Sequence, residues 1–193
     1  MTELPLFPLK TVLFPGGPLP LRIFEPRYLD MISDCMRNDH GFGVVLIQTG
    51  NETGASAIYE IGTVARIVDW HQEPDGLLGI TARGGERFSL RSAERQSDGL
   101  QVGVVDMLES EPPVKLPERY AMLAHILEGV LDDLDSHYQA LEKRFDDASW
   151  VGYRLAEVLP VPCEQKQVFL ELDDPVERLE LLRPILERLG HDA

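Results

Sequence analysis

The stretch that decides the fold is Leu4–Ile32, LPLFPLKTVLFPGGPLPLRIFEPRYLDMI. Two short apolar runs flank a Pro-Gly-Gly-Pro sequence at 15–18. The glycines there permit the positive φ angles of a tight reversal, and the prolines stiffen both of its shoulders. Pro26 suits the first position of a helix, because its missing N–H needs no partner there. The stretch therefore predicts strand, turn, strand and helix.

Two features of this stretch predict how its parts pack. Pro5 and Pro8 cannot donate hydrogen bonds to a neighbouring strand, so the strand Leu4–Leu9 is expected at a sheet edge or a bulge. In the helix, apolar residues recur at three- and four-residue spacing, which predicts one buried face. The residues on that face are Tyr28, Met31, Ile32, Cys35 and Met36.

The segment after the helix predicts more strands. The helix is expected to stop near Asn38-Asp39-His40-Gly41, and Gly41-Phe42-Gly43 also has the pattern of a helix stop. Phe42–Thr49 is a continuous apolar run that predicts a buried strand. Gly50–Ala57 is polar and aperiodic, which predicts a surface loop. Ile58–Trp70 is rich in β-branched residues and predicts a further strand.

Turn signals divide the next forty residues into a meander. Pro74-Asp75-Gly76 and Ser97-Asp98-Gly99 predict tight turns between strands. Gly84-Gly85 interrupts a strand pattern, which indicates a bulge or a close backbone approach. A last strand is expected at Leu100–Leu108. Six or seven strands and one early helix are thus predicted before residue 110.

The composition changes at Glu109–Pro117, where three prolines stand among charged residues. Such a segment is typical of a boundary, and we expect a β-rich subdomain at 1–112 and a helical one at 113–193. Strands followed by helices indicate an α+β fold.

The second part reads as helices. Apolar spacing from Pro117 to Lys143 predicts one long helix. Asp146–Ser149 offers caps for the next helix, and a shorter one follows from Pro162. Asp174 and the proline after it predict the start of the last helix, in which Pro184 should produce a kink.

Composition and charge narrow the function classes. The 193 residues carry a net charge of −15, with 14 Arg against 4 Lys. This argues against nucleic acid as a partner, because a phosphate-binding groove would stand against the overall field. Two cysteines without a CxxC pair indicate a reducing compartment. No apolar run approaches the roughly 20 residues of a membrane span, so we expect a cytoplasmic protein with no membrane contact.

No catalytic or cofactor motif is present. The sequence contains no GxxxxGK[ST], GxSxG, HExxH or GxGxxG pattern, so we expect no enzyme activity, no catalytic residue and no cofactor. Cys35 on an apolar helix face is expected to be inert packing rather than a nucleophile. The histidines show no metal-ligand spacing, so no metal site is expected. They are His40, His71, His125, His137 and His191.

Candidate binding groups are few. Trp70 and His71 at the end of a hairpin, with Phe14 at the first turn, are the candidate polypeptide-binding residues, as an exposed aromatic surface; core packing is the alternative for each aromatic ring. A polar cluster around the first helix could serve an enzyme with a dispersed site, or could simply be ion pairs. It comprises Arg22, Glu25 and Arg27.

An acidic run lies farther along the chain. It comprises Glu128, Asp132, Asp133 and Asp135. It could bind a cation or a basic partner, or it could be the solvated face of a helix.

The opening stretch also resembles the start of the Lon protease N-terminal domain family, with its Leu-Pro-Leu strand, aromatic-Pro-Gly turn and Ile-Phe-Glu before a helix. The middle of the chain is similar to that family in its Gly-Thr strand, its Pro-Asp-Gly turn and the Arg-Gly-x-x-Arg-Phe run at 83–88. The closing part is similar in Leu155-Ala156, Lys166-Gln167, Leu170-Glu171 and Arg178-Leu179. The resemblance covers essentially the whole chain.

The resemblance implies a PUA-like β pseudobarrel with one early helix, followed by a C-terminal helical bundle. It also implies binding of polypeptide segments, with the chain expected to be a stand-alone domain that lacks the ATPase and protease modules of Lon. No catalytic residue of the family has a counterpart here. RNA or nucleotide binding is the alternative, which rests on analogy to other PUA-like folds. The identity of the partner and the oligomeric state stay open.

Overall fold

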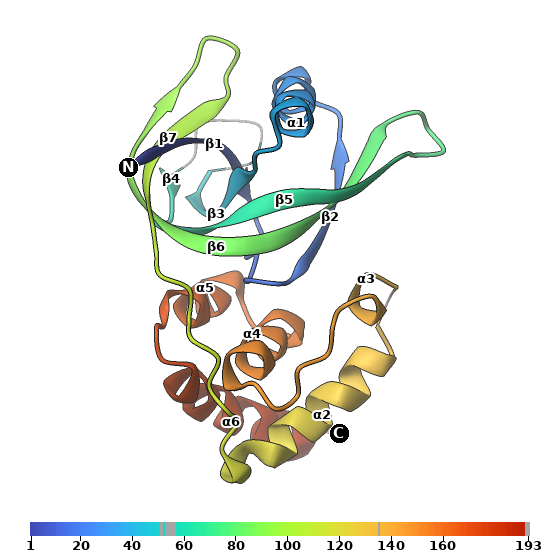
Figure 1. Ribbon diagram of the computed structural model, residues 1–193, viewed down its shortest axis with the longest axis vertical. Helices are drawn as coiled ribbons and strands as arrows, with labels where there is room; N and C mark the ends of the chain where they lie inside the picture. Colours follow the sequence, from blue (N-terminus) through green and yellow to red (C-terminus); the bar gives the residue numbers. More distant parts are fainter. Residues whose placement is uncertain (51, 53–56, 135, 192–193) are drawn as a thin grey trace. The chain divides into compact units, whose positions relative to one another are not determined.

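The computed structural model describes residues 1–50, 52, 57–134 and 136–191. The chain forms two compact units, Met1–Ser110 and Glu111–Ala193 (Figure 1). The first is built of strands around one helix and the second of helices, so the predicted α+β class is confirmed. Most of the loop predicted at 50–57 lies outside the described residues. Within the described ranges, no helix has the length and apolar character needed to cross a membrane.

The first unit contains seven strands and one helix among its described residues, as predicted. Their bounds are β1 Thr2–Leu9, β2 Pro18–Ile23, α1 Pro26–Asn38, β3 Phe42–Thr49, β4 Ala57–Ile58, β5 Ile61–Gln72, β6 Leu78–Arg95 and β7 Gln101–Met107.

Five of these strands close into a ring. They follow one another in the order β1, β7, β6, β5 and β3, and β3 pairs with β1 again. Neighbours in the ring are antiparallel except β1 and β3, which are parallel. The short β4 extends β3, while β2 pairs with β6 outside the ring. This closed ring is the predicted pseudobarrel (Figure 1).

The prediction that β1 lies at a sheet edge is wrong, because β1 joins the two ends of the ring. Its first half, Thr2–Leu6, pairs with β7, and its second half, Leu6–Leu9, pairs with β3. Pro5 falls in the first half and Pro8 in the second, so each proline has a pairing strand on one side only. A strand that changes partners midway thus tolerates prolines that a doubly paired strand would not.

Two glycine signals had different outcomes. A Cβ on Gly84 would lie 2.1 Å from the carbonyl oxygen of Phe14, and the register shifts beside it, so the predicted bulge and close approach are confirmed. The predicted helix stop near residues 38–41 is confirmed, but Gly41-Phe42-Gly43 is not what ends the helix. Asp39 ends α1 in the left-handed region at φ 51°. Gly41 instead allows close contact with the carbonyl of Ala65, 2.6 Å from where its Cβ would stand.

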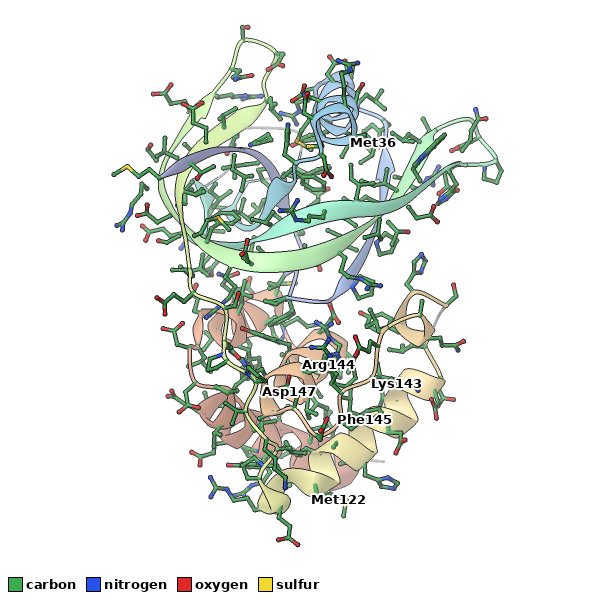
Figure 2. All side chains as sticks on the ribbon, in the orientation of Figure 1. Met36, Met122, Lys143, Arg144, Phe145 and Asp147 are labelled. Atoms are coloured by element: carbon green, nitrogen blue, oxygen red, sulfur yellow. The ribbon has the colours of Figure 1, made fainter. Side chains whose placement is uncertain are left out.

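Helix α1 buries the predicted face with one exception. Tyr28, Met31, Ile32 and Cys35 are buried in the core, and the ring of Tyr28 stacks on Phe7 of β1 with 3.9 Å between centroids. Met36 is the exception, because 45% of its surface is exposed (Figure 2).

The second unit consists of helices. Their bounds are a 3-10 turn at Glu118–Tyr120, α2 Ala121–Asp132, α3 Ser136–Gln139, α4 Ala148–Val158, α5 Cys163–Glu171 and α6 Pro175–His191. The prediction of one long helix from Pro117 to Lys143 is therefore wrong. Helix α2 ends at Asp132 with no basic residue in its last turn, and acidic side chains at that end oppose the helix dipole. The apolar periodicity continues past Asp132, but the acidic residues at this point do not favour a continuous helix.

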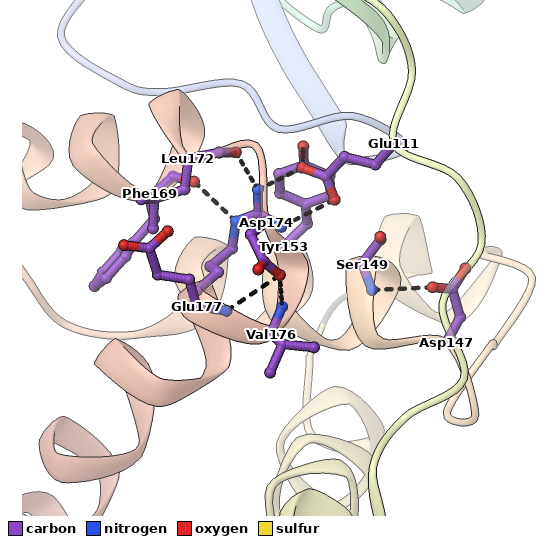
Figure 3. A network of polar contacts seen from close by, with 10 residues as sticks. Glu111, Asp147, Ser149, Tyr153, Phe169, Leu172, Asp174, Val176 and Glu177 are labelled. Atoms are coloured by element: carbon purple, nitrogen blue, oxygen red, sulfur yellow. Dashed lines mark hydrogen bonds and ion pairs between the residues drawn. The ribbon is translucent and has the colours of Figure 1, made fainter.

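The other helix starts are confirmed. The side chain of Asp147 accepts a hydrogen bond from the N–H of Ser149 at 2.9 Å, and that of Asp174 accepts one from Val176 at 2.8 Å (Figure 3). Each bond satisfies a donor that the first turn of a helix leaves without an intrahelical partner. Pro184 lies inside α6, as predicted.

Candidate functional site

The three sequence-predicted binding residues do not share one surface. Phe14 is completely buried in the structure, so the prediction that its ring forms part of an exposed surface is wrong. The backbone of Phe14 presses against Gly84, and its side chain fills the core. Trp70 and His71 lie near the end of β5, where 59% of Trp70 and about half of the His71 side chain are exposed.

A hollow of about 520 Å³ lies beside Trp70. One wall is the end of α1 and the two residues after it, and the other is β5. We call it the β5-edge trough, and its lining consists of Cys35, Met36, Asp39, His40 and the five consecutive residues 66–70. Successive residues of a strand point to opposite faces of a sheet. A hollow lined by five in a row therefore runs along the edge of the strand rather than over one face.

The edge of β5 at this trough has no pairing strand in the described part of the chain. On one side β5 pairs with β6 along Ile61–Gln72, but on the other side it pairs with β3 only at Thr63–Ala65. The backbone from Arg66 onward is therefore open on that side. The outer edge of β2 differs, because it carries Pro18 and Pro20, which cannot donate to an added strand. No proline occurs in Arg66–Gln72.

Three large apolar side chains of the trough are exposed. They are Val68 at 53%, Trp70 at 59% and Met36 at 45%, the last of which is labelled in Figure 2. Val68 is the extra residue of a bulge, because Ile67 and Asp69 pair with adjacent residues of β6. The bulge thus changes the alternation of side chains at the point where β5 becomes an edge.

A larger cavity of about 710 Å³ adjoins the trough and shares Asp39, His40 and Arg66 with it. We call it the acidic cavity. Two arginines, Arg27 and Arg66, line it together with six carboxylates. These carboxylates belong to Glu3, Asp30, Asp34, Asp39, Glu86 and Asp98. The excess of negative charge favours a positively charged occupant.

His40 stands where the two hollows meet. Its Nδ1 lies 3.1 Å from the carbonyl oxygen of Gly41, and its Nε2 lies 3.0 Å from Oδ2 of Asp34. Both ring nitrogens face acceptors, so the doubly protonated ring makes two hydrogen bonds where the neutral ring makes one. The Gly41 carbonyl and then the Asp34 carboxylate therefore raise the pKa of His40 above its ordinary 6.5.

The structure separates the polar cluster predicted around the first helix. Arg22 forms an exposed ion pair with Asp75 in the turn between β5 and β6. Arg27 is buried and pairs with Glu25, with 2.9 Å between Nε and the carboxylate. The three residues therefore do not converge on one point.

Arg27 acts as a structural tie. Its Nη1 donates to the carbonyl of Gly99 at 2.7 Å, and its Nη2 donates to the carbonyl of Glu52 at 3.0 Å. Its guanidinium carbon lies 4.6 Å from the centre of the Tyr28 ring. These bonds tie Gly99 and Glu52 to the start of α1.

The remaining candidates are Cys35 and the acidic run on the second unit. Burial, and then the charge of Asp34, raises the pKa of Cys35 to about 11, so the thiol stays protonated at neutral pH. In the acidic run, Asp132 pairs with Lys143 at 2.9 Å, while Asp135 lies outside the described residues. No cluster of three potential metal ligands occurs among the residues that the structure describes.

The second unit contains a polar network that no sequence motif indicated. Arg178 of α6 is completely buried and donates to both oxygens of Glu111 and to the carbonyls of Phe169 and Leu172 (Figure 3). Its guanidinium carbon lies 3.9 Å from the centre of the Tyr153 ring, whose hydroxyl also donates to Glu111. The only sequence signal for it was the Arg-Leu pair at 178–179 in the family resemblance.

A family model described as the ATP-dependent protease La (LON) substrate-binding domain matches residues 3–188. The chain belongs to this family. Similar curated proteins include Lon protease 2 of Myxococcus xanthus, 29% identical, with 96% of this chain and 23% of that protein covered. Lon protease of Escherichia coli strain K12 is 27% identical, with 96% and 24% covered. The chain thus spans about a quarter of the length of these proteases.

Similar solved structures share the fold. A Lon N-terminal domain protein from Xanthomonas campestris has a TM-score of 0.80 and 39% identity, with 95% of this chain and 98% of that chain covered. The N-terminal domain of Mycobacterium avium complex Lon protease has a TM-score of 0.60 and 16% identity, with 94% and 96% covered. The resemblance read from the sequence is therefore confirmed.

Proposed function

We propose that this chain is a non-enzymatic, cytoplasmic module that binds segments of polypeptide. The observation that carries the proposal is membership of the LON substrate-binding domain family over residues 3–188. The similar Lon proteases are proteases by name, so the binding would serve proteolysis. The printed sequence holds no motif for ATP hydrolysis, so binding is the role we assign to it.

The β5-edge trough is the part of the first unit that best suits this role. Met36, Val68 and Trp70 expose apolar surface around it, and exposed apolar surface of this kind marks interaction sites. Unfolded segments expose apolar side chains that a folded protein buries. We therefore assign to polypeptide binding Trp70, which lines the trough, and His71, the next residue of β5, although His71 is not part of the lining. Phe14 is removed from the site, because its side chain is buried.

The RNA alternative gains no support from the same surface. Six carboxylates and two arginines line the acidic cavity, which repels a phosphate backbone.

The test compares a reduced protein that stays unfolded, its cysteines blocked with neutral carboxamidomethyl groups, with the same protein in its native form. We expect the chain to bind the unfolded form, and Trp70→Ala to weaken binding at least about tenfold, because exposed tryptophans often dominate binding energy. Met122→Ala is the matched control. Met122 is 67% exposed on α2 of the second unit, so its loss should leave the affinity unchanged. Equal binding of both forms, or of neither form, would contradict the proposal.

A further inference from the structure

We propose that the bound segment adds to β5 as a new strand along the β5-edge trough, and that this segment is positively charged. The inference rests on the proposed function, since it assumes that the partner is a polypeptide. It goes further by naming the binding mode, the backbone that makes it and the chemistry of the segment.

The open edge of β5 supports the strand-addition mode. From Arg66 to Gln72 the backbone pairs with β6 alone among the described strands. A row of open N–H and C=O groups at strand spacing is matched by another extended backbone, which lies about 4.8 Å away. Five consecutive residues of β5 line the trough, so the space lies where that backbone would run.

The hydrogen bond of the Trp70 N–H also supports strand addition at this edge. Its N–H donates to Oδ1 of the preceding residue, Asp69, at 2.9 Å. An N–H that donates to a neighbouring carboxylate is not donating to the carbonyl of another strand. We infer that Asp69 covers one donor of the open edge and that a carbonyl of the added strand replaces it.

The walls of the trough indicate what the added strand carries. Met36 faces the trough from α1, and Val68 and Trp70 face it from β5, so apolar side chains on one side of the added strand would meet apolar surface. Side chains on an extended strand alternate between two sides. A segment with an apolar residue at every second position fits this arrangement.

The charge of the neighbouring cavity indicates the other side chains. The acidic cavity continues from the trough through Asp39, His40 and Arg66, and its carboxylates outnumber its arginines six to two. One of those arginines, Arg27, is already paired with Glu25. Lysine or arginine side chains of the added strand would therefore gain favourable charge interactions, and acidic ones would be repelled.

The experiment uses the full chain and an octapeptide of alternating lysine and valine with blocked ends. We expect binding by calorimetry, and slower hydrogen exchange of the Trp70 amide in the complex, because an added strand protects edge amides. Two further peptides carry N-methyl groups on either the lysine or the valine amides. One of them should lose binding at least about tenfold and the other should keep it, because an added strand uses alternate N–H groups.

A glutamate–valine octapeptide is the charge control and should not bind. Met36→Lys should weaken binding of the lysine–valine peptide, whereas Met122→Lys in the other unit should not. If both N-methylated peptides bind equally, or if exchange slows outside β5, the strand-addition mode is overturned while polypeptide binding stands. If neither the octapeptide nor the unfolded protein binds, the proposed function itself fails. Pairing of two copies of this chain through β5, detected by sedimentation together with β5 amide protection in the free chain, would also overturn the inference.

Discussion

Two buried arginines organise the molecule at the scale of single residues. Arg27 in the first unit donates to the carbonyl of Gly99, which lies 72 residues away. Arg178 in the second donates to the carboxylate of Glu111, 67 residues away, and to the nearby carbonyls of the α5 end. A guanidinium suits this task, because it presents five donors in a fixed plane. Both arginines also lie over a tyrosine ring, which covers their flat faces. These hydrogen bonds and ring contacts account for the burial of both side chains without a catalytic role.

Arg178→Lys should destabilise the second unit by about 1–3 kcal/mol, because lysine keeps the charge beside Glu111 but cannot also reach the two helix-end carbonyls, which lose their donors. Trp150 of α4 reports on this unit in urea unfolding once Trp70 has been replaced by phenylalanine. Arg188→Lys at an exposed position of the same helix is the control and should cost less than about 0.5 kcal/mol. Equal effects of the two substitutions would refute the assigned role of Arg178.

His40 should titrate above pH 6.5, because its protonated ring bonds both Gly41 and Asp34. A raised pKa in the folded state means that this stabilisation is complete below pH 6.5. It is lost as the pH rises through the folded-state pKa. An NMR titration of the His40 ring measures the value directly, and Asp34→Asn should lower it. A His40 pKa below 6.5 would be the contradicting result.

At the scale of elements, β1, β2 and β5 each lack a full-length pairing strand on at least one side, and each meets this in a different way. Strand β1 divides its pairing between β7 and β3, and β2 closes its outer edge with prolines. Strand β5 ends beyond its partner β3 and keeps its N–H groups. Its bulge at Val68 and the cover that Asp69 provides limit indiscriminate pairing. The bulge and Asp69 therefore restrict strand pairing at the open edge of β5 but do not prevent it.

Gly84→Ala and Gly85→Ala form a matched pair within β6. A Cβ at position 84 would stand 2.1 Å from the Phe14 carbonyl, whereas at position 85 the nearest atom lies 3.4 Å away. We expect Gly84→Ala to destabilise the first unit by at least about 1–3 kcal/mol, because β6 and the turn must move apart. Gly85→Ala should change the stability by less. Thermal unfolding followed by Trp70 fluorescence, with Trp150 replaced by phenylalanine, measures both, and a larger loss for position 85 would refute the assigned contact.

At the scale of the whole molecule, charge dominates. The net charge of −15 sets a field that attracts basic chains and repels phosphate backbones. The acidic cavity concentrates part of this charge beside the open strand edge. In the proposed binding mode, the long-range attraction of a basic segment and its backbone pairing with β5 thus act at the same place in the first unit.

Binding of the lysine–valine octapeptide should weaken as salt is added, because screening shortens the reach of the charges to about 10 Å at 0.1 M. A threonine–valine octapeptide isolates the part due to backbone and apolar contacts, and its affinity should change little. Calorimetry in about 50 mM and about 500 mM sodium chloride compares the two. The same salt dependence for both peptides would contradict a role for the carboxylates.

The sequence was most informative where local chemistry decides the structure. The reversal at 15–18, the helix start at Pro26, the turns at 74–76 and 97–99 and the caps at Asp147 and Asp174 are all present. Each depends on one residue's backbone freedom or on one side chain bonding a nearby N–H. The family also followed from the sequence, because its motifs lie in these same segments.

Periodicity alone failed in identifiable places. It extended one helix across Asp132 and Asp133, because apolar spacing does not record the charges that end a helix. It also counted Met36 as core, although the helix turns that residue toward solvent. Phe14 could not be placed, since a large aromatic beside a turn suits both a core and an interface.

By itself the sequence determined the order of the elements, the boundary in composition, the charge and the family. Only the tertiary structure decided which strand edge stays open and what surrounds it. Closing the ring pairs β1 with β3 and leaves β5 beyond Ala65 without a partner on that side among the described strands. The same closure sets the end of α1 beside β5, so Met36 and Trp70 line one trough. Such contacts join residues far apart in the chain, and no local pattern encodes them.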